Sequence, residues 1–375
     1  MKVQLLDLAS QYRKIKKEVL AEVKKVCESQ HYVLGKNVAA LESEIAAYSG
    51  AKFAIGVASG TDAILVALMA AGVKAGDKVV TTPFTFFATA GSISRLGAVP
   101  VFVDIEPDTF NIDPAALEAL LKKSSKGVKA IIPVHLYGQC ADMDRIMKVA
   151  KKYRIAVIED AAQSIGAGYK GRRAGSIGHL GCLSFYPTKN LGCFGDGGMV
   201  TTNDAKLADR VKMLRVHGSR VRYYHDEVGL NSRLDEVQAA ILRVKLKRLD
   251  SWSAGRVKNA KRYDALFEKA AIKGVLSTPK ISEGCVSVYN QYVIRVQKRD
   301  ELRAHLSAAG IGSEVYYPLP LHLQKCFKGL GYKKGSFPVS EKAAKEVLAL
   351  PIYPELTPAQ LKHVVATIGG FYTKA

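Results

Sequence analysis

The chain has 375 residues, of which 48% are hydrophobic and 24% charged, as is typical of a folded protein with a large core and two domains. Its net charge of +21 is spread along the sequence without any motif of a nucleic-acid-binding class, which favours an anionic small-molecule substrate over nucleic acid. No apolar run is long enough to cross a membrane, the N-terminal segment lacks a signal-peptide core, and the six cysteines have no metal-ligand spacing. We therefore expect a cytoplasmic protein without a metal site or a membrane segment.

The first two hundred residues predict an N-terminal helical segment followed by alternating strands and helices. Apolar residues at helical spacing predict helices over 10–50, with a break at HYVLGKN. The strand candidates are Phe53–Val57, Lys78–Thr82, Val99–Asp104, Ala130–His135, Ala156–Asp160, Gly181–Phe185 and Met199–Thr202. Helices are expected between them at Thr61–Ala71, Ala88–Leu96, Pro114–Lys122 and Met143–Lys152. Because several strands are continuous apolar runs, we predict an α/β domain with a mainly parallel sheet buried on both faces.

The last third of the chain predicts a second, smaller domain. A helical pattern begins near Leu234 and runs for about forty residues, which suggests a connector between domains. A strand over 285–296, a helix over 300–310, a strand over 311–318 and a final helix follow. We therefore predict a large domain over 1–245 and a small C-terminal α+β domain over 246–375.

Polar residues follow three of the predicted strands, at the sheet edge where open α/β folds bind ligands. The segment ASGTDA (58–63) leads into a helix and suits a phosphate-sized anion, although Ser-Gly-Thr-Asp is also a common turn. An aromatic of PFTFFATA (83–90) could lie on a planar ring or belong to the core, and chemistry alone does not distinguish Phe86 from Phe87. Asp160 ends an apolar strand, where it could face a protonated heteroaromatic nitrogen or cap the next loop.

A fourth segment, LSFYPTKNLGCFGDGG (183–198), places Lys189 between a strand and a glycine-rich loop. Most lysines are solvated surface charges, but partial burial would favour the neutral amine that forms a Schiff base. A lysine, a strand-end acid, an aromatic and a helix-start anion site together match the requirements of pyridoxal 5′-phosphate. The four features in combination predict a binding site for this cofactor.

The chain resembles the sugar aminotransferases of the DegT/DnrJ/EryC1/StrS family, which have the fold-type I architecture of pyridoxal-phosphate enzymes. The resemblance rests on motifs in the same order along nearly the whole chain: ASGTDA, PFTFFAT, VHLYGQCADMD, VIEDAAQSIGA, SFYPTKNLGCFGDGG, HGSRVRYYHDEVGLNSRLDEVQAA and YYPLPLH. It implies a large domain with a mainly parallel sheet, a small α+β domain and a homodimer with composite active sites.

The resemblance also implies a role for individual residues. Lys189 would be the Schiff-base lysine and the proton carrier, Asp160 would face the pyridine nitrogen and Gln163 the phenolic oxygen. The residues expected to hold the rest of the cofactor are Phe86 against the ring, Gly60, Thr61 and Ser184 on the phosphate, and Asn231 on the phosphate in the neighbouring subunit. Arg233, Tyr316 and Tyr317 are the candidates for substrate contact, and relatives can carry His at the position of Tyr316.

The function implied is transfer of an amino group from L-glutamate to a nucleotide-linked keto-sugar, with UDP- or dTDP-linked 3-keto-sugars favoured. A C4-keto-sugar aminotransferase is one alternative. A second is a sugar dehydratase, against which Lys189 argues because one dehydrating subgroup carries His there. A non-catalytic sensor or a nucleic-acid-binding protein is the third, and it would leave Lys189 without a role.

Overall fold

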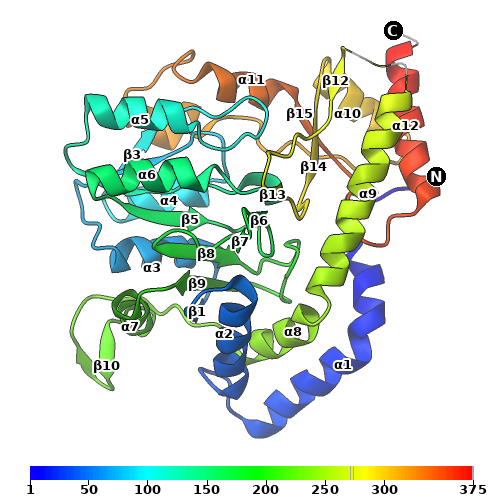
Figure 1. The fold of residues 1–375 in the computed structure, drawn as a ribbon. Helices are drawn as coiled ribbons and strands as arrows, with labels where there is room; N and C mark the ends of the chain where they lie inside the picture. Colours follow the sequence, from blue (N-terminus) through cyan, green and yellow to red (C-terminus); the bar gives the residue numbers. More distant parts are fainter. Residues whose placement is uncertain (271, 273, 374–375) are drawn as a thin grey trace.

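The computed structural model describes residues 1–270, 272 and 274–373. A large α/β part surrounds one sheet, and the long helix α9 (Leu249–Lys269) runs along its side (Figure 1). The N-terminus lies near α9 and α12 (Pro358–Thr373) in a smaller part. No helix within these ranges combines the length and the hydropathy needed to cross a bilayer.

The central sheet has seven strands in the order β1-β9-β8-β5-β4-β2-β3. Their bounds are β1 (Phe53–Val57), β2 (Lys78–Thr81), β3 (Val99–Phe102), β4 (Val128–Ile131), β5 (Ala156–Asp160), β8 (Leu180–Ser184) and β9 (Gly198–Thr202). Only β9 runs antiparallel to its neighbours, so the predicted mainly parallel sheet is confirmed. The strand predicted at Ala130–His135 ends early because Pro133 has no N–H group to continue the ladder.

Helices cover both faces of this sheet, because successive strand residues point to opposite sides. Val157 packs into one hydrophobic cluster, whereas its neighbour Ile158 packs into the other. The first cluster includes residues of α2 (Lys36–Ser49), α5 (Pro114–Lys123), α6 (Met143–Tyr153) and α8 (Glu236–Leu246). The second includes residues of α3 (Gly60–Ala70), α4 (Ala88–Arg95) and α7 (Ala205–Leu214). This double cover explains why the strands read as continuous apolar runs.

The single long helix predicted from Leu234 is wrong, since the chain forms α8 and α9 with a break between them. At the break the N–H of Arg248 donates to the carbonyl of Lys245 at 3.0 Å, and the buried Lys245 ammonium donates to the carbonyl of Gly192. Leu249 packs into the sheet cluster while Trp252 packs against α1 (Leu8–Ser29). No proline or glycine marks the break, which results from packing against two different partners.

The small part is built on a three-stranded antiparallel sheet in the order β12-β14-β15. Its elements are β12 (Leu276–Ser277), β14 (Tyr292–Val296), β15 (Val347–Leu350), α10 (Arg299–Ala308), α11 (Pro338–Glu346) and α12. The strand predicted over 285–296 is interrupted, because β13 (Cys285–Val286) pairs instead with β6 (Gly168–Tyr169) of the large part. The strand predicted over 311–318 is also wrong, since Ile311 and Glu314 form only isolated bridges.

The two parts share a hydrophobic core and a helix cap. The cluster of the small part includes Phe84 and Val134 from the large part. Asp104, which follows β3, accepts hydrogen bonds from the N–H groups of Val339 and Ser340 at 2.9 Å and so caps the start of α11. The division at 245/246 stays a prediction, and these contacts fix the small part against the sheet edge.

Candidate active site

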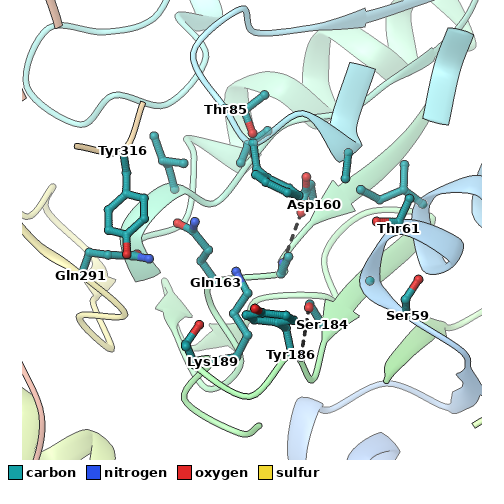
Figure 2. Close-up of a pocket in the computed structure, with 18 of the residues that line it drawn as sticks. Ser59, Thr61, Thr85, Asp160, Gln163, Ser184, Tyr186, Lys189, Gln291 and Tyr316 are labelled. Carbon is teal, nitrogen blue, oxygen red and sulfur yellow. Dashed lines mark hydrogen bonds between the residues drawn. The ribbon is translucent and has the colours of Figure 1, made fainter. Parts of the chain in front are cut away.

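A cavity of about 400 Å³ lies at the carboxyl ends of β1, β5 and β8. It extends toward the small part, whose side chains line its far wall (Figure 2). Every strand of the sheet except β9 points to this edge, so the loops that follow the strands converge there. The cavity is therefore at the position where open α/β sheets bind ligands.

One end of the cavity is formed by the start of α3 and the end of β8. The Ser59 hydroxyl accepts from the N–H of Asp62 at 3.1 Å, which leaves the first-turn amides of Gly60 and Thr61 available to a ligand. A Cβ on Gly60 would lie 2.6 Å from the Cβ of Ser184, so only glycine allows the helix start to approach the strand end. The amides of Gly60 and Thr61, together with the hydroxyls of Thr61 and Ser184, form an anion site at the start of α3.

Asp160 lies buried on the cavity wall at the end of β5. Its carboxylate accepts from the Thr89 hydroxyl at 2.7 Å and from the N–H of Ala162 at 3.2 Å. Burial raises the pKa of Asp160, and these hydrogen bonds and the charge of Lys189 only partly oppose it. A cationic N–H placed beside the carboxylate would compensate for its desolvation.

The preceding residue, Glu159, points away from the cavity into a structural network. Its carboxylate accepts from Nε2 of His135 at 2.8 Å and from the N–H groups of Gly175, Ile177 and Gly178 at 2.9, 2.7 and 2.6 Å. Since Nδ1 of His135 accepts from the backbone, Nε2 carries the proton. Burial alone would raise the pKa of Glu159, but these donors outweigh burial and hold it below its usual range.

Lys189 stands in the middle of the cavity, with its amino group near Gln163 (Figure 2). Its loop is closed by the N–H of Cys193, which donates to the carbonyl of Phe185 at 2.8 Å. Burial lowers the pKa of Lys189 to about 8, and the charge of Asp160 opposes this shift. A substantial fraction of the amine is therefore neutral and nucleophilic near physiological pH.

Gln163 is oriented by contacts at both ends of its amide. Its Oε1 accepts from the N–H of Tyr137 at 2.7 Å, and its Nε2 donates to the Tyr317 hydroxyl at 3.2 Å. Tyr137 has a left-handed backbone conformation, with φ of 59°, which turns the chain toward Gln163. Tyr317 therefore fixes the amide that faces the cavity.

The structure distinguishes Phe86 from Phe87, the adjacent aromatic residues that follow β2. Phe86 lines the cavity and is 57% exposed, with its ring centroid 6.1 Å from that of Tyr317. The Phe87 ring instead packs on Phe327, with the centroids 5.6 Å apart. Phe86 is thus the aromatic that a ring-shaped ligand in the cavity could contact.

The cavity brings together most of the side chains singled out in the sequence. Those that line it are Gly60, Thr61, Phe86, Asp160, Gln163, Ser184, Lys189, Tyr316 and Tyr317. Asn231 and Arg233 are not among the lining residues of this chain. Sequence reasoning missed Ser59, Thr85, Tyr186, Thr188, Asp196 and Gln291 as further lining residues. Ser59, Thr85, Tyr186, Thr188 and Asp196 lie inside the motifs already noted, whereas no pattern distinguishes Gln291.

These groups fit pyridoxal 5′-phosphate and offer no alternative metal site. The phosphate-sized cradle at α3, the buried Asp160 and the exposed face of Phe86 surround a lysine with a lowered pKa. Across the part of the chain that the structure describes, no three His, Cys, Asp or Glu side chains converge as metal ligands would. All six cysteines are free thiols.

Comparison with known proteins agrees with this geometry. A profile of the DegT/DnrJ/EryC1/StrS aminotransferase family matches residues 13–369. A pleiotropic regulatory protein of Geobacillus stearothermophilus is 55% identical over 99% of both chains. A UDP-2-acetamido-2-deoxy-3-oxo-D-glucuronate aminotransferase of Pseudomonas aeruginosa is 44% identical over 98% of this chain and 99% of its own.

Solved structures lead to the same assignment. The structure of DesV from S. venezuelae, in complex with a ketimine intermediate, superimposes with a TM-score of 0.94. It is 40% identical, and the match covers 99% of this chain and 98% of DesV. The profile and these relatives span nearly all of the sequence, and the chain belongs to the DegT/DnrJ/EryC1/StrS aminotransferase family.

Proposed function

We propose that this protein is a pyridoxal-phosphate-dependent aminotransferase that moves the amino group of L-glutamate to a nucleotide-linked keto-sugar, as a step in amino-sugar and polysaccharide biosynthesis. The observation that carries the proposal is the convergence of Lys189, Asp160 and Gln163 in one cavity that also contains a helix-start anion site. The family and the 3-oxo-sugar aminotransferase from P. aeruginosa support it.

Each side chain has a defined task in this proposal. Gly60, Thr61 and Ser184 bind the phosphate, Phe86 covers the ring, Gln163 bonds the phenolic oxygen and Asp160 bonds the pyridine nitrogen as N–H. Bound pyridoxal 5′-phosphate supplies a conjugated ring that delocalises the electron pair left when a proton leaves the amino-bearing carbon. Lys189 accepts that proton on Nζ and returns it, because burial lowers its pKa to about 8.

The favoured acceptors are UDP- or dTDP-linked 3-keto-sugars. The cavity has room beyond Lys189, bounded by Tyr316 and Tyr317 of the small part, which we assign to substrate contact. A protein with a net charge of +21 attracts an anionic diphosphate and speeds its capture.

A panel of UDP- and dTDP-linked 3-keto- and 4-keto-sugars with L-glutamate tests the proposed function. We expect 2-oxoglutarate and the amino-sugar, identified by mass, to form in equal amounts with at least one 3-keto-sugar. Amination confined to 4-keto-sugars would correct the position of transfer. Loss of water from the sugar without 2-oxoglutarate would instead indicate a dehydratase, and the absence of any reaction would favour a sensor.

We further propose that the active form is a homodimer in which Asn231 of each chain reaches the phosphate site of the other. Asn231 is exposed on a segment bridged to Val216, outside the cavity of its own chain. Arg233 lies two residues further on, and we assign it to the substrate side of the same composite site. Nearby, β10 (Ser219–Val221) and β11 (Tyr224–His225) form a hairpin. Its residues Val221, Tyr223 and Tyr224 are 62%, 79% and 73% exposed, which supports burial against a second copy.

Complementation tests this composite site. Lys189→Ala and Asn231→Ala chains are each expected to be weakly active, but co-expression should restore roughly a quarter of wild-type activity. Half of randomly mixed dimers are hetero-dimers, and one of the two sites in each then contains both native residues. Lys189→Ala mixed with Lys189→Arg is the matched control and should restore nothing. Failure of the first pair to recover activity would contradict an active site shared between chains.

A further inference from the structure

Several polar side chains of the cavity take no part in the proposed cofactor contacts, and Gln291 is the one with a buried, unbonded oxygen among the residues that the structure describes. Gln291 lies beside Tyr316 at the end of the cavity opposite Ser59, Thr61 and Ser184 (Figure 2). Its amide oxygen Oε1 is buried and finds no hydrogen-bond donor among the residues that the structure describes. Buried amide oxygens are almost always bonded in folded proteins, so an exception that borders a cavity indicates a ligand group that supplies the donor.

The position of Gln291 is fixed relative to Lys189. Nδ2 of Asn290 donates to Oδ1 of Asn190 at 2.9 Å, and Nδ2 of Asn190 donates to the carbonyl of Val288 at 3.0 Å. The residue before Gln291 is therefore bonded to the residue after Lys189. Both asparagines are buried, which shields these bonds from water. The backbone at Gln291 is thus held in register with the backbone at Lys189, which places the start of the Gln291 side chain relative to the lysine.

Gln291 also lies on the side of the cavity left for the substrate. The groups of the same chain that are assigned to the phosphate and the ring all come from residues before 190, whereas Gln291, Tyr316 and Tyr317 come from the small part. The Tyr317 hydroxyl is already bonded to Gln163. Gln291 therefore has a free acceptor on the sugar side, where a hydroxyl or an amide N–H of the substrate would lie.

We propose that Gln291 is a specificity-determining residue whose Oε1 accepts a hydrogen bond from an N–H or O–H group on the sugar of the acceptor. This assignment rests on the proposed function. It adds the class of sugar, which must carry a hydrogen-bond donor on the side turned away from the cofactor phosphate. A site built to bond such a donor discriminates strongly against sugars that lack it, because the buried oxygen would then remain unpaired.

Gln291→Met tests the assignment because methionine keeps the length of the side chain but lacks a strong acceptor. Gln297→Met is the matched control, since it makes the same change at an exposed residue that directly follows the far end of β14. The two half-reactions are measured separately in the holoenzyme by the change in cofactor absorbance, one with L-glutamate and one with nucleotide-linked 3-amino-sugars. Binding of the same amino-sugars is measured by calorimetry in the Lys189→Ala background, where turnover is expected to be about 10⁴-fold slower.

We expect Gln291→Met to weaken amino-sugar binding about tenfold and to leave the L-glutamate half-reaction within about twofold, as suits the loss of one neutral hydrogen bond. Gln297→Met should change neither. Sugars with a 2-acetamido and a 2-hydroxyl group distinguish the donor: loss confined to the 2-acetamido sugar identifies its N–H, and equal loss with both identifies a ring hydroxyl.

Two further outcomes overturn the assignment for different reasons. Unchanged sugar binding in Gln291→Met, or a loss that falls on L-glutamate instead, would refute the role of Gln291 while the wild-type reaction still supports the proposed function. A wild-type protein that converts none of the amino-sugars would overturn the proposed function, and the role of Gln291 with it.

Discussion

Replacing Lys189 by alanine is expected to reduce amino transfer about 10⁴-fold, the upper range of what a positioned proton-transfer group contributes. The variant should still bind pyridoxal 5′-phosphate, because the amides of Gly60 and Thr61 and the hydroxyl of Ser184 are unchanged. The visible absorption of the lysine-linked cofactor should be absent. Steady-state rates with a saturating donor, together with absorption spectra of purified protein, provide the measurement.

Lys245 provides the control for this prediction. Burial lowers the pKa of Lys245 to about 8, as it does for Lys189, but the Lys245 side chain lies on α8 and bonds the carbonyl of Gly192 outside the cavity. Reduction with borohydride should therefore attach the cofactor to the peptide that contains Lys189 and not to the one that contains Lys245. Lys245→Met should keep the visible band. Cofactor recovered on Lys245, or a normal spectrum in Lys189→Ala, would refute the assignment of Lys189.

The second large effect is expected for Asp160→Asn, which should reduce amino transfer about 10²- to 10³-fold, as is typical when one preorganised electrostatic group is removed. An amide holds the pyridine nitrogen as N–H far less well than a carboxylate does. The cofactor-free variant should be at least as resistant to heat as the wild type, because burial raises the pKa of Asp160 and its charge destabilises the fold. Turnover and the midpoint of thermal unfolding are the two measurements.

Glu159→Gln also replaces a carboxylate by an amide, one residue earlier. It should reduce the stability of the fold and affect turnover less than Asp160→Asn does. The buried carboxylate accepts from His135 and three backbone N–H groups, so we expect a loss of about 3 kcal/mol in the free energy of unfolding at neutral pH. The pKa of Glu159 is held below its usual range, so the stability it contributes is present above that range and is lost as the pH falls. Urea titrations at neutral and acidic pH should show the difference shrinking in acid. A larger loss of turnover in Glu159→Gln than in Asp160→Asn would contradict the division of roles.

The sheet was predictable because most of its strand residues are covered by helices on both faces. In a run such as that around Val157 and Ile158, successive residues pack into the hydrophobic clusters on opposite faces of the sheet. Every position is then apolar, which is visible in the sequence. The break between α8 and α9 left no such signal, since it depends on where Leu249 and Trp252 find partners. The short pairing of β13 with β6 likewise joins residues more than a hundred positions apart.

The cofactor side of the cavity was predictable for a similar reason, because its groups follow strand ends in compact motifs. Glycine at position 60 and the strand-end acid at 160 are chemically distinctive. Residue chemistry alone did not separate Asp160 from Glu159 or Phe86 from Phe87, and only the family resemblance did. Glu159 and Asp160 lie on opposite faces of one strand, and Phe86 and Phe87 contact different rings. Gln291 stood out only after the fold had placed its amide oxygen without a donor.

The cap that Asp104 forms on α11 has a consequence for protein engineering. Segment exchange between relatives at 245/246 would transfer Gln291, Tyr316 and Tyr317 as a set while leaving Lys189 and Asp160 behind, which is an attractive way to change the acceptor sugar. In such a chimera, the first N–H groups of the incoming α11 would still have to donate to the side chain of residue 104 of the recipient. Chimeras should therefore combine parents that have the same residue at position 104. Otherwise the residue at 104 must be transferred together with the segment after 245.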